Sequence, residues 1–526
     1  MEVSIHWIDM TMVGVYFVIA IGIGLYFAKR HESAEEYFLA GRSVTWPLIG
    51  LSLYASNMSS TTLVGLPGDA YDTGISVFNY EWMAAVILVV FAVFFLPFIL
   101  RARVFTMPEF LERRFDRRSR MIFAGLTLLL NVLVDTAGGL YAGSLLIQIV
   151  YPQIPIWQTV TVLAIAAGIY TVAGGLAAVI ITDAIQGVLL TIGAAVISWI
   201  AFQEVGGWSA VVDAVDPAKL SLIRPSGDPG VPWHGLLTGI PLIGFYFWCT
   251  NQFMVQRVLS AKSLNHGRWG SLFAGVLKLP PLFIMVLPGT FALVLYPNLD
   301  EPNLVFPTMM FDLLPVGLLG LVLAGFVAAL MSQIDSTLNS ASTLVTMDFV
   351  RPYKPDLTSE QLMWVGRAVT VGFMLLAVLW APQIQQFPSL FKYLQSVLSY
   401  TVSPVVALFL VGMMWRRANA LGAFLALATG IPIGLGFFVF NEIVGVTDVH
   451  FLTVSPILFA WATAIMVLVS LATPHLRDAD SESYVWTPAY FREESRALAG
   501  TPLYANYRVQ GLVLLAGAVA LVTAFW

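Results

Sequence analysis

Long apolar runs separated by short polar segments dominate the pattern along this chain. A helix of about 20 apolar residues is long enough to cross the hydrocarbon core of a bilayer. The runs lie near residues 6–27, 44–71, 78–101, 121–150, 156–174, 178–203, 236–260, 269–297, 308–348, 363–388, 390–415, 419–441, 452–473 and 508–526. The pattern therefore predicts an all-α integral membrane protein with about fourteen transmembrane helices.

One of these runs is interrupted in its middle. Within 44–71, the stretch from Leu51 to Gly74 reads LSLYASNMSSTTLVGLPGDAYDTG, with Ser, Thr and Asn crowded before Pro67 and Gly68. Backbone that leaves helical geometry at membrane depth is tolerated only where it is buried in protein or lines a cavity. The freed carbonyls and the hydroxyls can coordinate a cation or a polar solute. The alternative is a polar patch that packs against a neighbouring helix.

The order of the spans predicts two related halves. Five spans in 44–203 are followed by a Pro-containing external loop, 204–235, and by five more spans in 236–415. An odd number of spans per half gives the halves opposite orientations, which is the inverted-repeat plan of secondary transporters. Residues 1–43 then form an extra N-terminal helix and a cytoplasmic loop, and residues 416–526 form accessory helices.

Basic residues gather in alternate loops, for example at Arg42, Arg101, Arg113, Arg257 and Arg416. The opposite loops, around 72–77, 151–155, 298–307 and 442–451, contain no Lys or Arg. The positive-inside rule places the basic loops in the cytoplasm and both termini on the extracellular or periplasmic side. We expect a multi-pass protein of the plasma (inner) membrane.

Composition narrows the function. The chain is 58% hydrophobic and 11% charged, whereas soluble domains carry about 25% charged residues. Its longest polar segments are too short for a typical soluble domain, so function must lie within the helix bundle. Cys249 is the only cysteine, which excludes an intramolecular disulfide. No metal-binding His/Glu pattern or nucleophile motif appears. We therefore expect a protein of the lipid bilayer that is not an enzyme and has no nucleic acid as a partner.

Several ionisable residues stand within apolar runs. Glu81 opens the third run, Asp135 and Asp183 lie inside later ones, and Lys278 is isolated in the run 269–297. Such groups are costly in a membrane, so a functional role is the default interpretation and Lys278 needs a carboxylate or carbonyl partner. For Glu81 the alternative is an interfacial carboxylate in water. A polar stripe on one helical face of 308–348 must also face protein or water; it comprises Ser332, Asp335, Ser336 and Asn339.

A series of motifs carries a family resemblance. They are YFLAGR (37–42), ASN-x-S (55–59), EWMA (81–84), TMPEF (106–110), YTVAGGLAAV with TDAIQ (170–186), WCTNQFMVQR (248–257), LKLPPLFIMVLPG (277–289) and NSASTLVTMD (339–348). In this order they resemble the sodium/solute symporter family, and most closely its sodium/glucose cotransporter branch, over about three quarters of the chain. The resemblance implies fourteen helices, a LeuT-type core of inverted five-plus-five repeats, and sodium-driven uptake by alternating access.

The resemblance also implies a sodium site between the interrupted helix and the run 308–348. The matching ligands are the backbone carbonyls of Ala55, Met58 and Ala329 and the hydroxyl of Ser332. Gln333 stands where the family usually has a second hydroxyl, and its amide oxygen can also ligate a cation.

A second ion site occurs in some family members and here maps to Asp183, Ser332, Asp335 and Ser336. Two aspartates at one site repel each other unless a cation lies between them or one takes up a proton. The resemblance thus implies a second sodium or a proton. In the alternative, Asp183 caps helix ends and Asp335 forms hydrogen bonds within the bundle.

For the solute, Glu81, Lys278 and Gln395 match positions that bind sugar hydroxyls, and Tyr80 and Phe391 match an outer gate. Thr62 and Phe247 differ from what sugar-transporting relatives often carry, and Asp69, Asp72 and Asp135 add acidity that enters the pocket or faces a vestibule. The residues expected to contact the solute are Thr62, Leu66, Asp69, Tyr80, Glu81, Phe247, Trp248, Lys278, Phe391 and Gln395.

We therefore expect sodium-coupled uptake of a sugar or a related polyol. Alternatives are sodium- or proton-coupled symport of inositol, sialic acid or an amino acid. The spans near these sites show no arginine to receive an anionic solute, which argues against sialic acid and carboxylates. A transporter-like membrane sensor is a further alternative, but no signalling domain follows the last run.

Overall fold

The computed structural model describes residues 5–28, 33–299, 301–387, 390–447, 449–474 and 479–526. This part of the chain is helical, with isolated bridges in place of strands. By length and composition, nine of its helices can cross a membrane, or ten if the bent pair α19 (Leu390–Thr401) and α20 (Ser403–Met414) counts as one span. The all-α membrane fold is confirmed, while the number fourteen stays a prediction.

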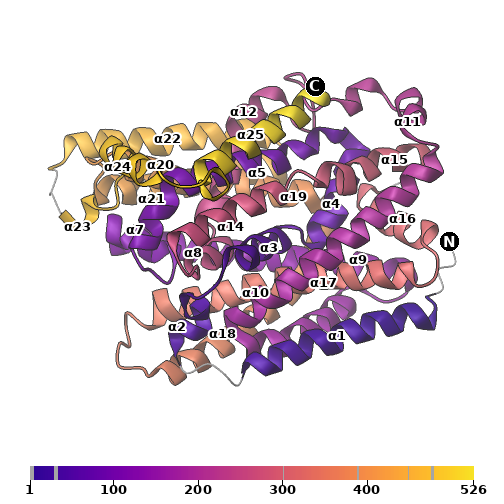
Figure 1. Ribbon diagram of the computed structural model, residues 1–526, viewed down its shortest axis with the longest axis horizontal. Coiled ribbons are helices and arrows are strands. Elements are labelled where there is room, and N and C mark those ends of the chain that lie inside the picture. The colour runs from indigo at the N-terminus through magenta and orange to yellow at the C-terminus, as the bar shows by residue number, and fades with distance from the viewer. Residues whose placement is uncertain (1–4, 29–32, 300, 388–389, 448, 475–478) are drawn as a thin grey trace.

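A buried helix, α17 (Leu318–Leu344), forms the centre of the bundle (Figure 1). In its most apolar window, 83% of the residues are buried. It packs against α1 (Trp7–Ala28), α3 (Trp46–Asn57) and α10 (Ile156–Val205). Because protein surrounds it, α17 can carry the Ser, Thr and Asn side chains that lipid would not tolerate.

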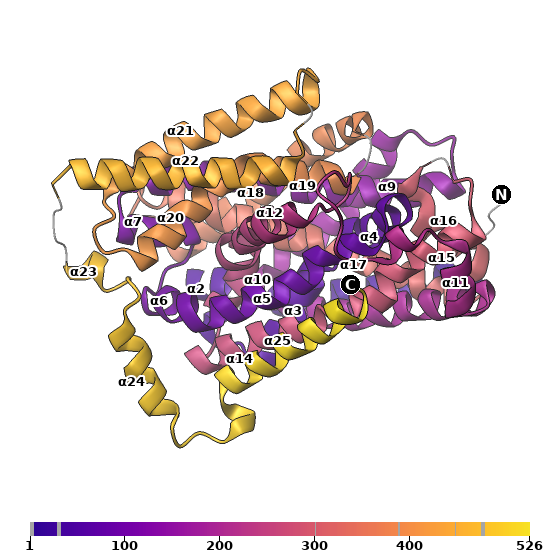
Figure 2. The same cartoon turned by 90° about the horizontal axis from the view of Figure 1, so that it is seen from above.

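Other helices lie at the periphery. Figure 2 shows α21 (Ala420–Phe438) and α22 (Phe451–Ala472) along one flank, and α24 (Pro488–Leu498) and α25 (Tyr507–Ala524) along the other. Only 22% of the most apolar window is buried in α25 and in α18 (Ser359–Trp380). Their exposed apolar side chains suit contact with lipid.

The interrupted helix predicted in 44–71 is confirmed. The chain forms α3, leaves helical geometry at Met58 (φ −78°, ψ 69°) and Ser59 (φ −92°, ψ 176°), and resumes as α4 (Ser60–Thr73). Pro67 lies inside α4 without ending it. The break therefore falls among the Ser and Asn residues rather than at the proline.

The second half opens on a similar interruption. Helix α12 (Trp233–Phe245) passes through a π-helical turn, Tyr246–Thr250, to an extended residue, Asn251 (φ −64°, ψ 128°), before α13 (Gln252–Leu259) begins. Interrupted spans at corresponding places in two halves are typical of inverted repeats.

The predicted run 308–348 is not one helix, which corrects the sequence-based boundary. Helix α16 (Val305–Leu313) ends, and α17 starts after Gly317, whose φ is +89°. The Asp9 carboxylate of α1 accepts hydrogen bonds of 2.7 Å from the N–H groups of Gly317 and Gly320. It thereby satisfies donors that the first turn of α17 leaves without partners.

Helix α10 is not a single straight rod. Leu163 and Leu330 both approach Gly143, whereas Gly193 contacts Val322. Leu330 and Val322 are about 12 Å apart along α17, but positions 163 and 193 would be about 45 Å apart in a straight helix. Both arms of α10 therefore run along α17, in keeping with two predicted spans in this region.

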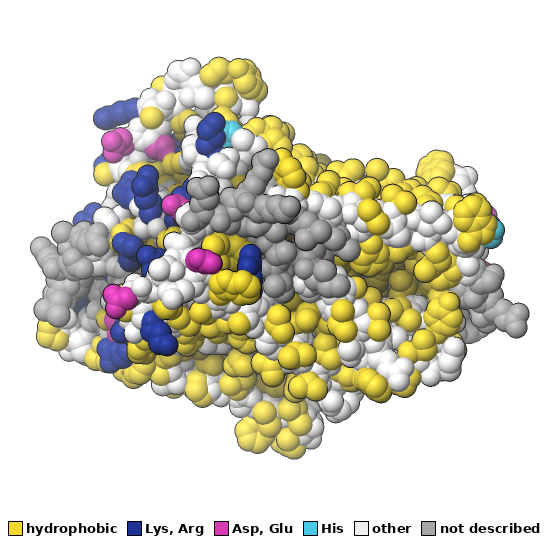
Figure 3. Space-filling view, turned by 90° about the horizontal axis from the view of Figure 1, so that it is seen from below, with side chains coloured by type: hydrophobic (Ala, Val, Ile, Leu, Met, Phe, Trp, Pro, Cys, Tyr) yellow, Lys and Arg dark blue, Asp and Glu magenta, His cyan; other side chains and the backbone are white. Residues whose placement is uncertain are grey.

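Charged side chains gather at one end of the bundle, which we call the basic end. It carries α7 (Met107–Arg114) and the start of α8 (Arg117–Leu130). Figure 3 shows Lys and Arg side chains clustered there beside a broad apolar surface. Figure 1 places the described parts of both chain ends away from α7. The assignment of the basic end to the cytoplasm remains a prediction.

Candidate functional site

A cavity next to the helix break collects most of the residues expected to bind the solute. Its lining includes Thr62, Tyr80, Glu81, Phe247, Trp248, Lys278, Phe391 and Gln395. The lining also contains Ser56, Asn57, Ser59 and Thr61 from the break itself. Leu66 and Asp69 do not line it; both are buried, and Asp69 accepts a hydrogen bond from Thr73.

An ion pair forms the polar centre of the cavity. Lys278, fully buried at the end of α14 (Leu264–Leu277), pairs with Glu81 of α5 (Asn79–Val90) and donates a hydrogen bond to the Asn57 side chain. Lys278 Nζ also lies 5.6 Å from the centroid of the Trp248 ring. The partner that an isolated membrane lysine needs is thus Glu81, and the contact to Asn57 connects this pair to the helix break.

Other polar atoms around the cavity lack hydrogen-bond partners. Within the described residues, Tyr80 Oη and Gln395 Oε1 are buried without a hydrogen bond, whereas Glu81 Oε2 pairs with Lys278. A buried polar atom left unpaired costs about 1–3 kcal/mol. The Tyr80 ring packs edge-on against Phe391 at 5.3 Å between centroids. The arrangement presents unused hydrogen-bonding groups beside an aromatic pair, which suits a polar solute with apolar faces.

The helix break leaves two backbone carbonyls without a hydrogen bond in the described part of the chain. The Met58 N–H donates to the Tyr54 carbonyl at 2.8 Å and the Ser59 N–H to the Asn57 carbonyl at 2.9 Å. In the described part of the chain, no N–H or hydroxyl donates to the carbonyls of Ala55 and Met58. These are two of the expected sodium ligands, and α17, which carries Ala329 and Ser332, packs against both arms of the break. Unpaired carbonyls at an unwound helix suit a sodium ion.

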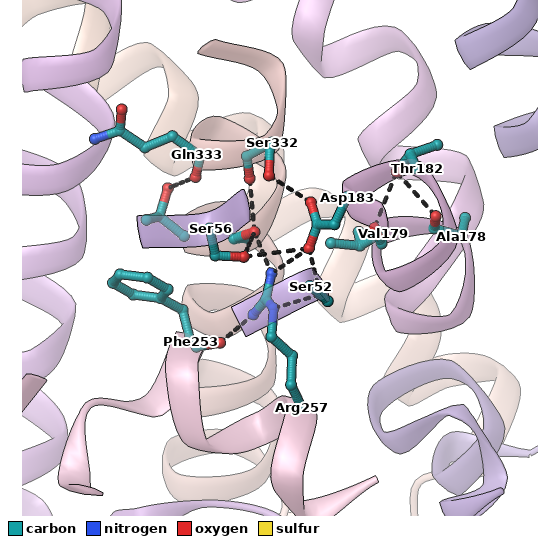
Figure 4. Close-up of polar contacts among 12 residues, drawn as sticks. Ser52, Ser56, Ala178, Val179, Thr182, Asp183, Phe253, Arg257, Ser332 and Gln333 are labelled. Carbon is teal, nitrogen blue, oxygen red and sulfur yellow. Dashed lines mark hydrogen bonds and ion pairs between the residues drawn. The ribbon is translucent and has the colours of Figure 1, made fainter. Parts of the chain in front are cut away.

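The Gln333 amide bonds to groups other than the expected sodium ligands. Its Nε2 donates to the backbone carbonyl of Asp135 at 2.7 Å, and its Oε1 accepts from Ser60 Oγ at 3.4 Å. Figure 4 shows the amide turned away from Ser332 and Asp183. In this conformation the amide therefore connects α17 to α4 and to the π-helical turn that contains Asp135, while its role as a sodium ligand stays a prediction.

Asp183 is surrounded by donors from other helices (Figure 4). Its carboxylate accepts from Ser52 Oγ at 2.6 Å and Ser332 Oγ at 2.5 Å, and it forms an ion pair with Arg257 at 2.8 Å. Arg257 also donates to Ser336, and both ionised side chains are almost completely buried. The cation that faces Asp183 in this conformation is therefore a guanidinium group of the protein.

The buried position of Arg257 corrects the sequence analysis, which counted this residue among those of the basic loops. Its position inside the run 236–260, at the end of WCTNQFMVQR, was the available signal. The structure brings Asp183, Ser332 and Ser336 together around it. Asp335 is fully buried on α17 but forms no described hydrogen bond with Asp183.

The donor set limits the chemistry of the site. The described residues contain no group of three or more His, Cys, Asp or Glu side chains that could hold a metal ion. The available ligands at the break are carbonyl and hydroxyl oxygens, which suit a hard monovalent cation. Among the described residues, no arginine lines the cavity.

Comparisons with a family profile and with known sequences both relate this chain to sodium symporters. The profile of the sodium:solute symporter family matches residues 37–430. The chain is 35% identical to sodium/glucose cotransporter 4 of Danio rerio, covering 92% of this chain and 82% of that protein. It is also 35% identical to the sodium/mannose cotransporter SLC5A10 of Bos taurus, covering 91% of this chain and 89% of that protein.

Solved structures support the fold. A sodium-coupled sialic acid symporter in a substrate-bound, outward-open state superposes with a TM-score of 0.77 at 24% identity, covering 90% of this chain and 99% of that one. Mhp1, a nucleobase-cation-symport-1 family transporter, superposes with a TM-score of 0.56 at 14% identity, covering 85% and 98%.

Proposed function

Because this chain belongs to the sodium:solute symporter family, we propose that it takes up a sugar or a related polyol together with sodium. Family membership makes the protein a sodium-coupled membrane transporter and not an enzyme, so these two expectations are confirmed. The identity of the solute and the location in the plasma membrane belong to the proposal.

The observation that carries the proposal is the set of polar atoms around the cavity. Lys278 offers donors, Glu81 offers acceptors, and Gln395 offers both. Each sugar hydroxyl both donates and accepts, and a sugar that leaves water needs these bonds replaced. The rings of Tyr80 and Phe391 supply apolar contact for the faces of a sugar ring.

Coupling follows from the location of the break. A sodium ion held by the carbonyls of Ala55, Met58 and Ala329 and the hydroxyl of Ser332 would join the broken helix to α17. Asn57 and Thr62, on the same break, line the solute cavity. Sodium would thereby fix the arms that shape the cavity, and its loss to the cytoplasm would favour solute release. One charge crossing a potential of 100 mV supplies about 2.3 kcal/mol.

Two observations refine the alternatives. The ion pair between Arg257 and Asp183 favours one coupling sodium over a second sodium or a proton at the Asp183 site. The sialic acid symporter shares the fold, but the absence of a lining arginine among the described residues favours a neutral solute over an anionic one.

Uptake into proteoliposomes tests the proposal. The wild-type protein should accumulate at least one labelled hexose or polyol under an inward sodium gradient and should not do so when potassium replaces sodium. Glu81→Gln and Lys278→Met should abolish this uptake, because each leaves the other charge buried without a partner. Asp213→Asn, at an exposed position of α11 (Trp208–Ala214), is the control. Uptake driven by a pH gradient and independent of sodium would refute sodium coupling.

A further inference from the structure

Asp135 stands apart from the other carboxylates of the bundle. Asp9 accepts two backbone N–H groups, Asp183 pairs with Arg257, and Asp348 pairs with Arg120 at 2.6 Å. The Asp135 side chain, within the described residues, makes neither a hydrogen bond nor an ion pair, although it lies in the middle of the apolar span Arg117–Val150. A structural carboxylate at such a position would need partners.

The surrounding structure holds Asp135 firmly. It belongs to a π-helical turn, Asn131–Thr136, between α8 and α9 (Ala137–Val150). Asn131 donates to Ser340 at 3.0 Å, and the hydroxyls of Thr136 and Thr337 are 2.7 Å apart. Together with the bond from Gln333 to the Asp135 carbonyl, these contacts fasten the turn to α17. Single π-helical turns inside α-helices often occur at functional sites.

Asp135 and the preceding Val134 line the same cavity as Glu81 and Lys278. Glu81 and Lys278 neutralise each other, so Asp135 is the carboxyl group of the lining that has no cationic partner among the described residues. A neutral sugar would bring no cation to this carboxyl group, whereas a protonated amine would pair with it as a carboxylate and would donate charge-assisted hydrogen bonds.

We propose that Asp135 binds a protonated amino group of the solute, so that this transporter prefers an amino sugar over the corresponding neutral hexose. The inference rests on the proposed function, since it names the solute class of the same cavity. Glu81, Lys278 and Gln395 bind the hydroxyls, and Asp135 selects the amine from the side of the cavity formed by the π-helical turn.

The test compares labelled glucosamine with glucose, and mannosamine with mannose, in proteoliposomes under an inward sodium gradient. At about pH 6.5 an amino group with a pKa like that of a peptide α-amino group, about 7.7–8.0, is protonated. Wild-type protein should take up the amino sugar in preference to the hexose. Asp135→Asn should lower the ratio of amino sugar to hexose uptake by about tenfold or more while hexose uptake persists, and Asp213→Asn should leave the ratio unchanged.

The outcomes separate the two proposals. Sodium-driven uptake of glucose or mannose by the wild-type protein without preference for the amino sugar supports the proposed function and overturns the role of Asp135. An unchanged ratio in Asp135→Asn, or an altered sodium requirement at an unchanged ratio, overturns it as well. If Asp135→Asn does not fold, competition decides: glucosamine must inhibit wild-type hexose uptake more strongly than N-acetylglucosamine, which lacks the charge. If none of these sugars is taken up, the role of Asp135 is overturned, and the proposed function fails as well unless another hexose or a polyol is accumulated with sodium.

Discussion

Gln333 is the residue at which a single substitution is expected to change the proposed sodium site most directly. Because its amide bonds to Asp135 and Ser60, Ser332 is the hydroxyl ligand of the proposed sodium site on this face of α17. The position next to Ser332 is therefore occupied by a side chain whose amide does not point toward the proposed sodium site.

We predict that Gln333→Ser strengthens sodium binding. The smaller side chain places a hydroxyl oxygen beside Ser332, within reach of the carbonyls at the break. The sodium concentration for half-maximal uptake should fall by about threefold to tenfold, equivalent to about 0.6–1.4 kcal/mol. Gln333→Ala, which loses the same amide contacts without adding a hydroxyl, is the matched control. Equal effects of the two substitutions would show that only the loss of the amide matters.

The Arg257 and Asp183 pair permits a second prediction at this scale. Removing one member leaves the other charge buried without its partner, which costs about 3–5 kcal/mol. Arg257→Met should therefore lower the thermal unfolding temperature markedly, and the double variant Arg257→Met/Asp183→Asn should recover much of the loss. Unfolding in detergent, followed by intrinsic fluorescence, measures both. Additive losses in the double variant would contradict a direct pair.

Among the elements, α4 depends on close packing against α15 (Leu287–Leu295). Gly289 faces the carbonyl of Pro67 so closely that an added Cβ atom would lie 2.2 Å from that oxygen. The contact is with backbone, so no side-chain rotation can relieve it. The position requires glycine because α4, the second arm of the broken helix, must lie against α15.

We predict that Gly289→Ala displaces α4 and weakens both stability and transport. The displacement would move Thr62 and the sodium-facing break, so sodium-driven uptake should fall by about tenfold or more. Gly125→Ala in α8 is the control, because a Cβ atom there meets nothing within 4 Å. That control should be neutral or slightly stabilising, since alanine favours a helix over glycine. Equal behaviour of the two variants would refute the packing argument.

At the scale of the whole molecule, bound sodium should hold the broken helix against α17 and so stabilise the folded protein. A ligand that binds only the folded protein stabilises it by about 2.7 kcal/mol at 100 times its dissociation constant. The thermal unfolding temperature should therefore rise with sodium chloride and stay lower in potassium chloride of equal ionic strength. Identical curves in the two salts would argue against a specific sodium site.

The sequence predicted those parts of the fold that follow from the contact of the chain with lipid. Apolar runs must be helical because a bilayer cannot satisfy free backbone groups, and this rule located most helices and the interruption at Ser56–Thr62. It did not reveal that α16 and α17 separate at Gly317, because the turn that joins them is made mostly of apolar residues and so continues the hydropathy pattern of a helix.

The sequence by itself determined the family, the use of sodium and eight of the residues that line the cavity, because these depend on residue types in an ordered series of motifs and on the cost of polar groups in a membrane. Only the tertiary structure decided how those groups pair. It placed Arg257 against Asp183, Lys278 against Glu81 and the Gln333 amide against Asp135. These contacts join residues more than 70 positions apart, and their geometry depends on how the helices pack, which no local pattern records.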